Sequence, residues 1–463
     1  MPPPDSDDDF PITAAAVTTL HSRRDFSVAN FAAVSRGGAV IRLTADACAR
    51  MDASHAAFLG FIDAHPTPWV YGVTGTILSG HAVTLTPAER RAQIRRPIAA
   101  GAVLFGDPIP ERIVRGVLFC RLSNFIEGHS AVRAEVALAV AAMLERSLPQ
   151  LPRSGHGTAG EMSLLSHVFG ALVENVNLKE KEASALINGA PVAAALTADT
   201  LLCAGPLLRE VVDVLGLAID VYRAPLDAYD AVLGGLWLNP HAERALALLA
   251  GAATPRTGPP RLAQAPVCFR AIPRLLARAL GCFDALCVAA ERALRAVTDN
   301  PVVLTEGGSM RILSNGGFFD ADAPALFDDF AGVCADLVRL LEKLAARLAE
   351  TADPAALTRS AQARLRALVS ALSGYAEDAA ASTSRTPLPG TDGGGAPQND
   401  LISPVVQAWA KLTAASEFLS SAIAVLRAVA AGVQGDVSSD PCNLDRALRY
   451  RMVSVTDLEL LLE

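Results

Sequence analysis

Residues 154–167 (SGHGTAGEMSLLSH) form the stretch of this sequence whose residue types and spacing point most directly to chemistry. Thr158, Ala159 and Gly160 could form a tight turn backed by a helix, at the floor of a pocket. Such a turn presents backbone N–H groups, which can stabilise an oxyanion or an enolate without any prosthetic group. The alternative is a turn with a purely structural role.

Tyr71 offers a second reactive group, in a loop bounded by glycines at residues 69–75 (WVYGVTG). A phenol has an ordinary pKa of about 10, so a tyrosine that acts as a general base needs this value lowered. The positive N-terminal end of a helix could lower it. The alternative is a loop tyrosine that only packs its ring. His167, at the end of the first stretch, is expected to be a structural hydrogen-bonding residue.

The 154–167 stretch resembles the signature of the aromatic amino acid ammonia-lyases and aminomutases, typically G-S-x-G-A-S-G-D-L-x-P-L-[SA]-H. Seven further segments resemble other motifs of that family, in the same order along the chain. They are residues 69–75, the run from 99 to 133, and residues 181–189 (KEASALING), 264–270 (QAPVCFR), 296–301 (AVTDNP), 314–319 (SNGGFF) and 398–403 (QNDLIS).

The family's electrophile is made from its own backbone, and one oxygen needed for it is missing here. In the family an Ala-Ser-Gly triad cyclises: the Gly nitrogen attacks the carbonyl two residues back, and the Ser loses water to give a methylidene-imidazolone. Here the triad is Thr158-Ala159-Gly160. Thr is tolerable at the first place, because the carbonyl belongs to the backbone, but Ala159 has no β-hydroxyl to lose. The resemblance therefore implies a divergent member that lacks this prosthetic group, and no cofactor or metal is expected.

Three catalytic residues are implied by the resemblance. Tyr71 matches the family's catalytic base, Asn188 matches a residue that contacts both substrate and electrophile, and Arg270 matches the residue that holds the substrate carboxylate. A guanidinium group suits that task because its planar fork binds a carboxylate bidentately. The alternatives are a structural salt bridge for Arg270 and a backbone-satisfying amide for Asn188.

The substrate-binding positions have become less polar than the family pattern. The second Tyr of the family is Val267 here, an imidazole is replaced by Phe319, and the late acidic position is Asn399. Ile98 falls near the position that selects the substrate ring. An apolar pocket follows, which does not favour histidine as a substrate. The expected substrate-binding residues are Ile98, Thr158, Ala159, Gly160, Val267, Phe319, Gln398 and Asn399.

Three functions remain in competition at this point. The first is an enzyme of specialised metabolism that uses the lyase scaffold for acid–base elimination, addition, isomerisation or ring closure beside a carbonyl or carboxylate. The second is a non-catalytic member that binds a ligand or accompanies an active paralogue. The third is an ammonia-lyase or aminomutase. Survival of Tyr71 and Arg270 favours the first, because a decayed site has no reason to keep both.

The elements that must position these residues are mostly helices. Apolar spacing predicts two helices within 108–148, broken near Gly128, and further helices at 201–217, 273–297, 323–348 and 404–433, with a small hairpin at 302–313. The resemblance implies an all-α fold, an elongated central bundle of long helices like that of histidine ammonia-lyase. It also implies a homotetramer whose sites draw on several subunits. We expect one domain at 13–463, after a disordered acidic tail at 1–12.

Composition limits the environment and partners of the chain. Hydrophobic residues make up 51% and aromatic residues 5%, so the core is built from Ala, Leu and Val. No uncharged apolar run approaches the roughly 18 residues needed to span a bilayer, so apolar surface buried between subunits is expected. A net charge of −8 argues against nucleic acid and anionic membranes as partners. The eight cysteines stand singly, and no signal peptide is apparent, so a cytoplasmic protein with reduced thiols and a small-molecule substrate is expected.

Overall fold

The computed structural model describes residues 16–65, 69–75, 84–94, 98–172, 176–252, 259–306, 309–388 and 400–434. The chain forms two compact units, each assembled from segments that are far apart in the sequence. The first unit comprises Met1–Ala198, Glu291–Phe319 and Gly390–Ser403, and the second comprises the remaining three segments. A single domain over 13–463 stays a prediction, and the acidic tail at 1–12 lies outside the described residues.

Short helices dominate the first unit. They are α1 (Val28–Ser35), α2 (Ala45–Ala64), α3 (Pro87–Ile94), α4 (Glu111–Phe125), α5 (Ala134–Ala142), α6 (Met162–Phe169) and α7 (Glu182–Ile187), with 3₁₀ turns η1 (Arg23–Asp25), η2 (Ile98–Gly101), η3 (Met143–Glu145) and η4 (Gly170–Leu172). Several begin at a side-chain cap. Thr44, for example, accepts a hydrogen bond from the Ala47 N–H at the start of α2.

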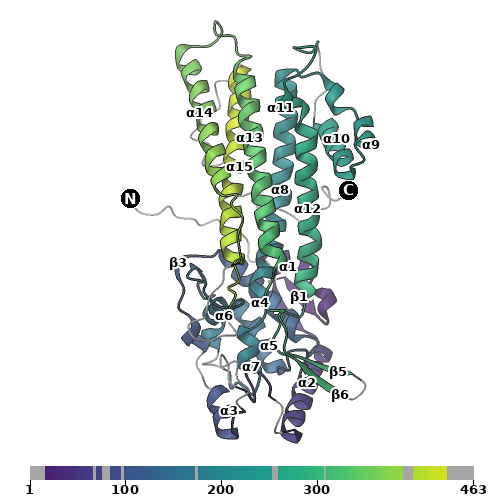
Figure 1. The fold of residues 1–463 in the computed structure, drawn as a ribbon, viewed down its shortest axis with the longest axis vertical. Helices are drawn as coiled ribbons and strands as arrows, with labels where there is room; N and C mark the ends of the chain where they lie inside the picture. The colour runs from purple at the N-terminus through teal and green to yellow at the C-terminus, as the bar shows by residue number, and fades with distance from the viewer. Residues whose placement is uncertain are drawn as a thin grey trace. The chain divides into compact units, whose positions relative to one another are not determined.

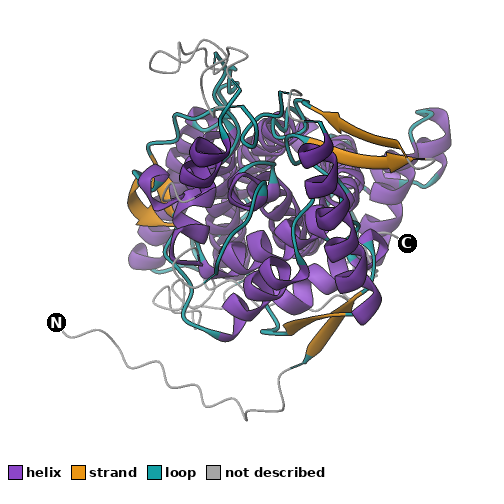
Figure 2. Cartoon of the chain, turned by 90° about the horizontal axis from the view of Figure 1, so that it is seen from below, coloured by secondary structure: helices purple, strands orange, loops and turns teal. Residues whose placement is uncertain are grey.

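Strands are few and short beside the helices (Figure 2). Three two-stranded ribbons are described, all in the first unit: β1 (Val17–Leu20) parallel to β2 (Val40–Leu43), β3 (Phe105–Pro108) antiparallel to β4 (Pro152–Ser154), and β5 (Val302–Glu306) antiparallel to β6 (Ser309–Leu313). The third ribbon is the hairpin predicted from the alternating pattern of 302–313. The other two were not predicted, because strands this short carry too little alternation.

Helix α4 forms the centre of the first unit. Every residue from Gly116 to Phe125 is buried. The rings of Phe26 and Phe31 lie 4.8 and 6.1 Å from the ring of Phe119, which joins the α1 region to α4. A Cβ at Gly116 would approach the Phe31 ring to 2.6 Å, so glycine permits this close packing.

Long helices make up the second unit. They include α13 (Asp322–Ala349), α14 (Arg359–Ala381) and α15 (Val405–Val433), which pack on one another and run side by side in Figure 1. Two further long helices, α8 (Pro191–Tyr222) and α12 (Ile272–Arg295), contribute residues to both units. The remaining elements are η5 (Leu226–Tyr229), α9 (Val232–Leu236), α10 (Pro240–Ala252) and α11 (Val267–Arg270). The expected all-α fold class is therefore correct.

Helix α15 is, among the described helices, the one long and apolar enough to cross a membrane by length and composition, with a mean hydropathy of 1.4. The core helix of a soluble protein can meet the same criteria. Lys411, Glu417 and Arg427 interrupt its apolar sequence. Its buried residues recur at three- and four-residue spacing, and the helix contacts both α13 and α14. These contacts pack one face of α15 into the bundle.

The helices predicted from apolar spacing are present. The segment 108–148 contains α4 and α5, and the break between them includes Gly128, whose φ of +83° suits glycine. The predicted helices at 201–217, 273–297, 323–348 and 404–433 correspond to α8, α12, α13 and α15. The short helices before residue 108 and the helix α14 were not predicted individually.

Candidate active site

The turn at Thr158, Ala159 and Gly160 connects β4 to α6. Gly160 has a φ of +61°, and a Cβ there would meet the Phe318 ring at 2.9 Å, so the turn requires glycine. Among the described residues, the N–H groups of these three positions find no hydrogen-bond acceptor. Three adjacent donors at the start of a helix form an arrangement suited to a developing negative charge.

Glu161 anchors this turn to the beginning of α8. Its side chain is buried, and its two carboxylate oxygens accept hydrogen bonds from the N–H groups of Val192 and Ala193, both at 2.7 Å. A carboxylate at this place satisfies donors that have no partner within the helix and offsets the positive end of the helix dipole. The N-terminal end of α8 is therefore already neutralised by the protein.

The Glu161 contact leads to a stability prediction. Glu161→Ala leaves two buried N–H groups without a partner, and each such group costs about 1–3 kcal/mol. We expect a clear loss of unfolding free energy, measured by chemical denaturation. Glu210→Ala is the matched control. Glu210 is exposed on α8, the helix whose first turn Glu161 contacts, and its replacement should change stability little. Equal stability of the two variants would contradict the role given to Glu161.

Asn188 is buried at the end of α7, next to the start of α8. The guanidinium group of Arg121, which is fully buried on α4, donates through Nη1 to the backbone oxygens of Asn188 and Ala185, the latter at 2.5 Å. Burial lowers the pKa of Arg121 to about 10, so the group is still charged at neutral pH. A Cβ at Gly189 would approach Arg121 Nη2 to 2.5 Å, so glycine follows Asn188 for a steric reason.

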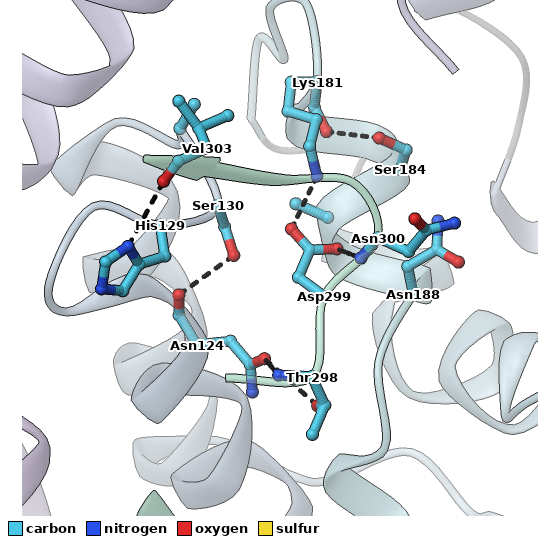
Figure 3. Close-up of polar contacts among 12 residues, drawn as sticks. Asn124, His129, Ser130, Lys181, Ser184, Asn188, Thr298, Asp299, Asn300 and Val303 are labelled. Atoms are coloured by element: carbon cyan, nitrogen blue, oxygen red, sulfur yellow. Dashed lines mark hydrogen bonds and ion pairs between the residues drawn. The ribbon is translucent and has the colours of Figure 1, made fainter. Parts of the chain in front are cut away.

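A buried ion pair holds the other end of α7. Lys181 Nζ lies 2.6 Å from Asp299 Oδ2, and both side chains are inaccessible to solvent (Figure 3). Burial lowers the pKa of Lys181, and the Asp299 carboxylate opposes this effect. The other carboxylate oxygen of Asp299 accepts the Asn300 N–H at 2.8 Å. The pair therefore ties the 181–189 segment to the 298–300 segment.

Further hydrogen bonds extend from the 298–300 segment to neighbouring elements (Figure 3). Thr298 accepts the Ala190 N–H through Oγ1 at 2.9 Å, and its own N–H donates to Asn124 Oδ1 at 2.6 Å. On the other side, Asn300 Oδ1 accepts the Asn315 N–H at 2.9 Å. The segment thus connects the start of α8 and the C-terminal end of α4 with the 314–319 loop.

Asn315 was not predicted, although it shapes the site. Its side chain donates to the Asp299 carbonyl at 3.0 Å and accepts the Gly317 N–H at 2.7 Å. The family pattern S-G-G-N-F-H has its amide two positions later, at Gly317 here, so the sequence suggested that the amide was lost. The only signal that could have located it was the asparagine in SNGG itself.

These contacts form a closed circuit within the first unit. From Gly160 and Glu161 the contacts pass to the start of α8, then through Thr298 to Asn300, then to Asn315, and through Phe318 back to Gly160. The circuit brings together the 158–160 turn, the segment from Asn188 to the start of α8, and the loop that carries Phe319. Three segments predicted from motifs are thus neighbours in space.

Ile98 joins the same region through η2. This 3₁₀ turn packs against α6, and a Cβ at Gly101 would meet Ser166 Oγ at 2.5 Å. Ile98 is buried, and His167 on α6 accepts the Leu104 N–H through Nε2 at 2.9 Å. His167 is therefore a structural hydrogen-bonding residue, as expected, whereas the role of Ile98 in ring selection stays a prediction.

Tyr71 lies in a compact loop of the first unit. The Val70 carbonyl accepts the N–H groups of Val73, Thr74 and Gly75 at 2.9–3.1 Å, and Val70 and Val73 pack in an apolar cluster with α2 and β5. Burial raises the pKa of Tyr71 above its ordinary value of 10. A resting base needs a lowered pKa, so the direction of this shift favours a neutral phenol at physiological pH. The role of Tyr71 as a general acid or base stays a prediction.

Arg270 and Val267 belong to α11, in the second unit. The position of α11 is set by Phe269, whose ring stacks on Tyr222 at 4.3 Å and whose carbonyl accepts the Tyr229 hydroxyl at 2.8 Å. Arg270 is exposed and donates through Nε to the Ala265 carbonyl at 3.0 Å. Val267 is 68% exposed, so it does not belong to the core of its unit.

Two predicted substrate-binding residues, Gln398 and Asn399, lie outside the described residues. In the part of the chain that the structure describes, no group of three His, Cys, Asp or Glu side chains could hold a metal ion. The expected independence of metals and cofactors stays a prediction.

Comparison with known proteins identifies the family of the chain. The family model "Aromatic amino acid lyase" matches residues 26–175 and 171–386. The chain is 30% identical over 361 residues to a histidine ammonia-lyase of Streptomyces avermitilis, covering 68% of this chain and 67% of the relative.

Solved structures are similar over nearly the whole chain. The Treponema denticola ergothionase, an ergothioneine degrading enzyme, has a TM-score of 0.78 at 14% identity, covering 96% of this chain and 97% of that one. Pantoea agglomerans phenylalanine aminomutase has a TM-score of 0.77 at 16% identity, covering 96% and 98%. At these identities the structures show a shared fold. With its ordered motifs, this fold and the matched family model, the chain belongs to the aromatic amino acid lyase family.

Proposed function

We propose that this family member is an enzyme that works without the methylidene-imidazolone. It performs acid–base elimination or addition, isomerisation or cyclisation on a small substrate that bears a carbonyl or carboxylate group, in specialised metabolism. The observation that carries the proposal is the 158–160 turn. It keeps three backbone donors without acceptors in the described structure, while Ala159 lacks the hydroxyl from which the methylidene would form.

The remaining groups suit chemistry beside a carbonyl. When a nucleophile adds to a conjugated double bond, an electron pair moves to the carbonyl oxygen, and the enolate is stabilised by hydrogen bonds from the turn. Tyr71, a neutral phenol in a partly buried loop, then donates its proton to the adjacent carbon. The phenolate so formed takes up the proton that the added nucleophile releases. In the reverse direction the phenol passes its proton to the departing substituent, and the phenolate removes the proton from carbon.

The absent electrophile restricts the substrate rather than the reaction class. An unactivated amine leaves poorly without help, so the substrate needs a better leaving group or a more acidic C–H bond. Arg270 holds the substrate carboxylate and Asn188 contacts the substrate. The resemblance assigns Ile98, Val267, Phe319, Gln398 and Asn399 to the substrate, and it implies a cytoplasmic homotetramer whose sites draw on several subunits.

The proposed absence of the prosthetic group gives the most direct test. The intact mass should equal that of the unmodified chain, and the absorbance band of the chromophore should be missing, because Ala159 cannot dehydrate. A histidine ammonia-lyase measured in parallel provides the positive control. A deficit of water located by peptide mapping at residues 158–160 would overturn the proposal.

A substrate screen tests the reaction itself. The panel contains conjugated carboxylates, β-substituted carbonyl compounds and carboxylates with a quaternary α-ammonium group, which departs as a neutral amine. Ergothioneine belongs in the last class, since the T. denticola enzyme of the same fold is described as degrading it. Turnover with at least one class is expected. Binding without turnover would support the non-catalytic function instead.

The third function, an ammonia-lyase or aminomutase, is favoured by one observation: similar sequences from Streptomyces avermitilis and Streptomyces griseus are histidine ammonia-lyases. The proposal predicts that phenylalanine, tyrosine and histidine release ammonia more slowly than about 1 per second, the lower end of ordinary enzyme turnover. Faster release would replace the proposal with the ammonia-lyase function.

Light scattering tests the proposed assembly. A homotetramer is expected at micromolar concentration, because the chain is rich in apolar residues and exposes large ones such as Leu138 and Val288. Leu138→Glu and Val288→Glu place a charge in each of these exposed positions, and a shift to smaller species would identify the interface. A monomer in the unmodified protein would contradict the composite site.

A further inference from the structure

The Tyr71 loop has a rigid backbone but leaves the phenol to be oriented by its neighbours. Val70 and Val73 are fixed in the apolar cluster, and three N–H groups converge on the Val70 carbonyl. Gly72, next to Tyr71, has a φ of +72°. The backbone on both sides of Tyr71 is therefore determined, whereas the side-chain rotamer depends on what the ring contacts.

Among the described residues, the indole of Trp69 is the aromatic ring that pairs with the Tyr71 ring. The two ring centroids lie 6.3 Å apart with an interplanar angle of 57°, within the range of a favourable tilted aromatic pair. The indole is seated directly on Gly75. A Cβ on Gly75 would overlap its Nε1 and would lie 2.5 Å from Cε2 and 2.7 Å from Cδ1.

Packing rather than hydrogen bonding holds the indole in this seat. Its Nε1 is buried and finds no acceptor among the described residues, an arrangement that costs free energy. Gly75 is held in turn by hydrogen bonds from its own N–H to the Val70 carbonyl and from Gln93 Nε2 to its carbonyl, at 2.9 and 3.3 Å. The fixed glycine thus defines where the indole lies.

We infer that Trp69 is a positioning residue for Tyr71, because its indole, seated on Gly75, sets the orientation of the phenol. The inference rests on the proposed function for the catalytic role of Tyr71, but the contact itself can be tested without a substrate. Trp69 lies outside the family motif of this loop.

The test follows the ionisation of Tyr71 by phenolate absorbance at alkaline pH. Tyr71→Phe is subtracted to isolate one of the five tyrosines. Trp69→Leu removes the ring, and Gly75→Ala displaces it by a separate route. Both should lower the titration midpoint of Tyr71 towards the free value of about 10, because the phenol gains solvent. Trp69→Phe keeps a ring in the seat and should retain most of the original midpoint.

Gly60→Ala is the control, since a Cβ at Gly60 on α2 meets nothing within 4 Å and should leave the titration unchanged. Circular dichroism checks folding, and the difference emission against Trp69→Phe reports whether Gly75→Ala moves the indole. A displaced or deleted indole with an unchanged Tyr71 midpoint overturns the inference. So does a Trp69→Phe variant that behaves like Trp69→Leu.

A kinetic measurement separates this inference from the proposed function. On a substrate found by the screen, Trp69→Leu should lower kcat with little change in KM, and adding it to Tyr71→Phe should cause no further loss. If no compound is turned over, the proposed function fails, while the titration still decides whether Trp69 positions Tyr71.

Discussion

Replacing Tyr71 by Phe is expected to lower turnover about 10²–10⁴-fold, the usual contribution of a general acid–base group. The substitution keeps the ring and removes only the hydroxyl, so packing in the Val70 loop should be retained. The rate is measured on the substrate identified by the screen, with thermal unfolding as a check on the fold. Full activity of Tyr71→Phe would show that proton transfer uses another group.

The pH dependence of this reaction follows from the raised pKa of Tyr71. In the addition direction Tyr71 donates a proton. The phenol is protonated below its folded-state pKa, so donation is fully available at neutral pH and is lost as pH rises through that value. The alkaline limb of kcat/KM should therefore lie above pH 10 or thereabouts. It should be absent from the residual activity of Tyr71→Phe. A limb near neutral pH that is unchanged in the variant would point to a different titrating group.

Arg270→Lys gives a contrasting control. It keeps the positive charge and loses the planar fork, so it should mainly raise KM. A large fall in kcat with unchanged KM would mean that Arg270 acts on the transition state and not as the anchor of the substrate.

Lys181→Met is expected to cause the largest loss of stability. It leaves the Asp299 carboxylate buried without its cation, and breaking a buried pair in this way costs about 3–5 kcal/mol. The free energy of unfolding is measured by chemical denaturation. Binding of ligand should also weaken, because the same segment ends at Asn188.

Two further variants make this result specific. Lys181→Met combined with Asp299→Asn removes the uncompensated charge and should recover part of the stability. Arg347→Met breaks the exposed pair with Glu350 and should change the free energy of unfolding little, because solvent screens an exposed pair. Equal losses for Lys181→Met and Arg347→Met would mean that the buried pair has no special weight.

Local patterns account for how far the fold could be predicted. In α13 the buried residues, among them Phe327, Cys334 and Leu341, recur every three or four positions, which is the signature of an amphipathic helix. Helix α4 is less regular, because it is buried all round and contains Arg121 and Asn124. The apolar period of α4 is weak because residues on all of its faces are buried along its second half.

Motifs account for how far the site could be predicted. They located Thr158–Gly160, Asn188 and Phe319 on segments that the structure brings together. The motifs include glycines, such as Gly160 and Gly189, at positions where the backbone approaches another segment closely. They did not indicate Asn315, whose amide supports the loop from a different position. The direction of the Tyr71 pKa was also beyond them, since burial of the phenol in the folded loop raises it.

By itself the sequence determined the family, the helical class and the missing hydroxyl of Ala159, because these depend on residue types and short spacings. Only the tertiary structure decided which polar groups are satisfied and which are not. The Glu161 carboxylate accepts hydrogen bonds from the start of α8, and Lys181 forms an ion pair with Asp299. The 158–160 N–H groups, in contrast, have no acceptor among the described residues. That difference arises from contacts between segments 31 to 118 residues apart in the sequence, which no local pattern encodes.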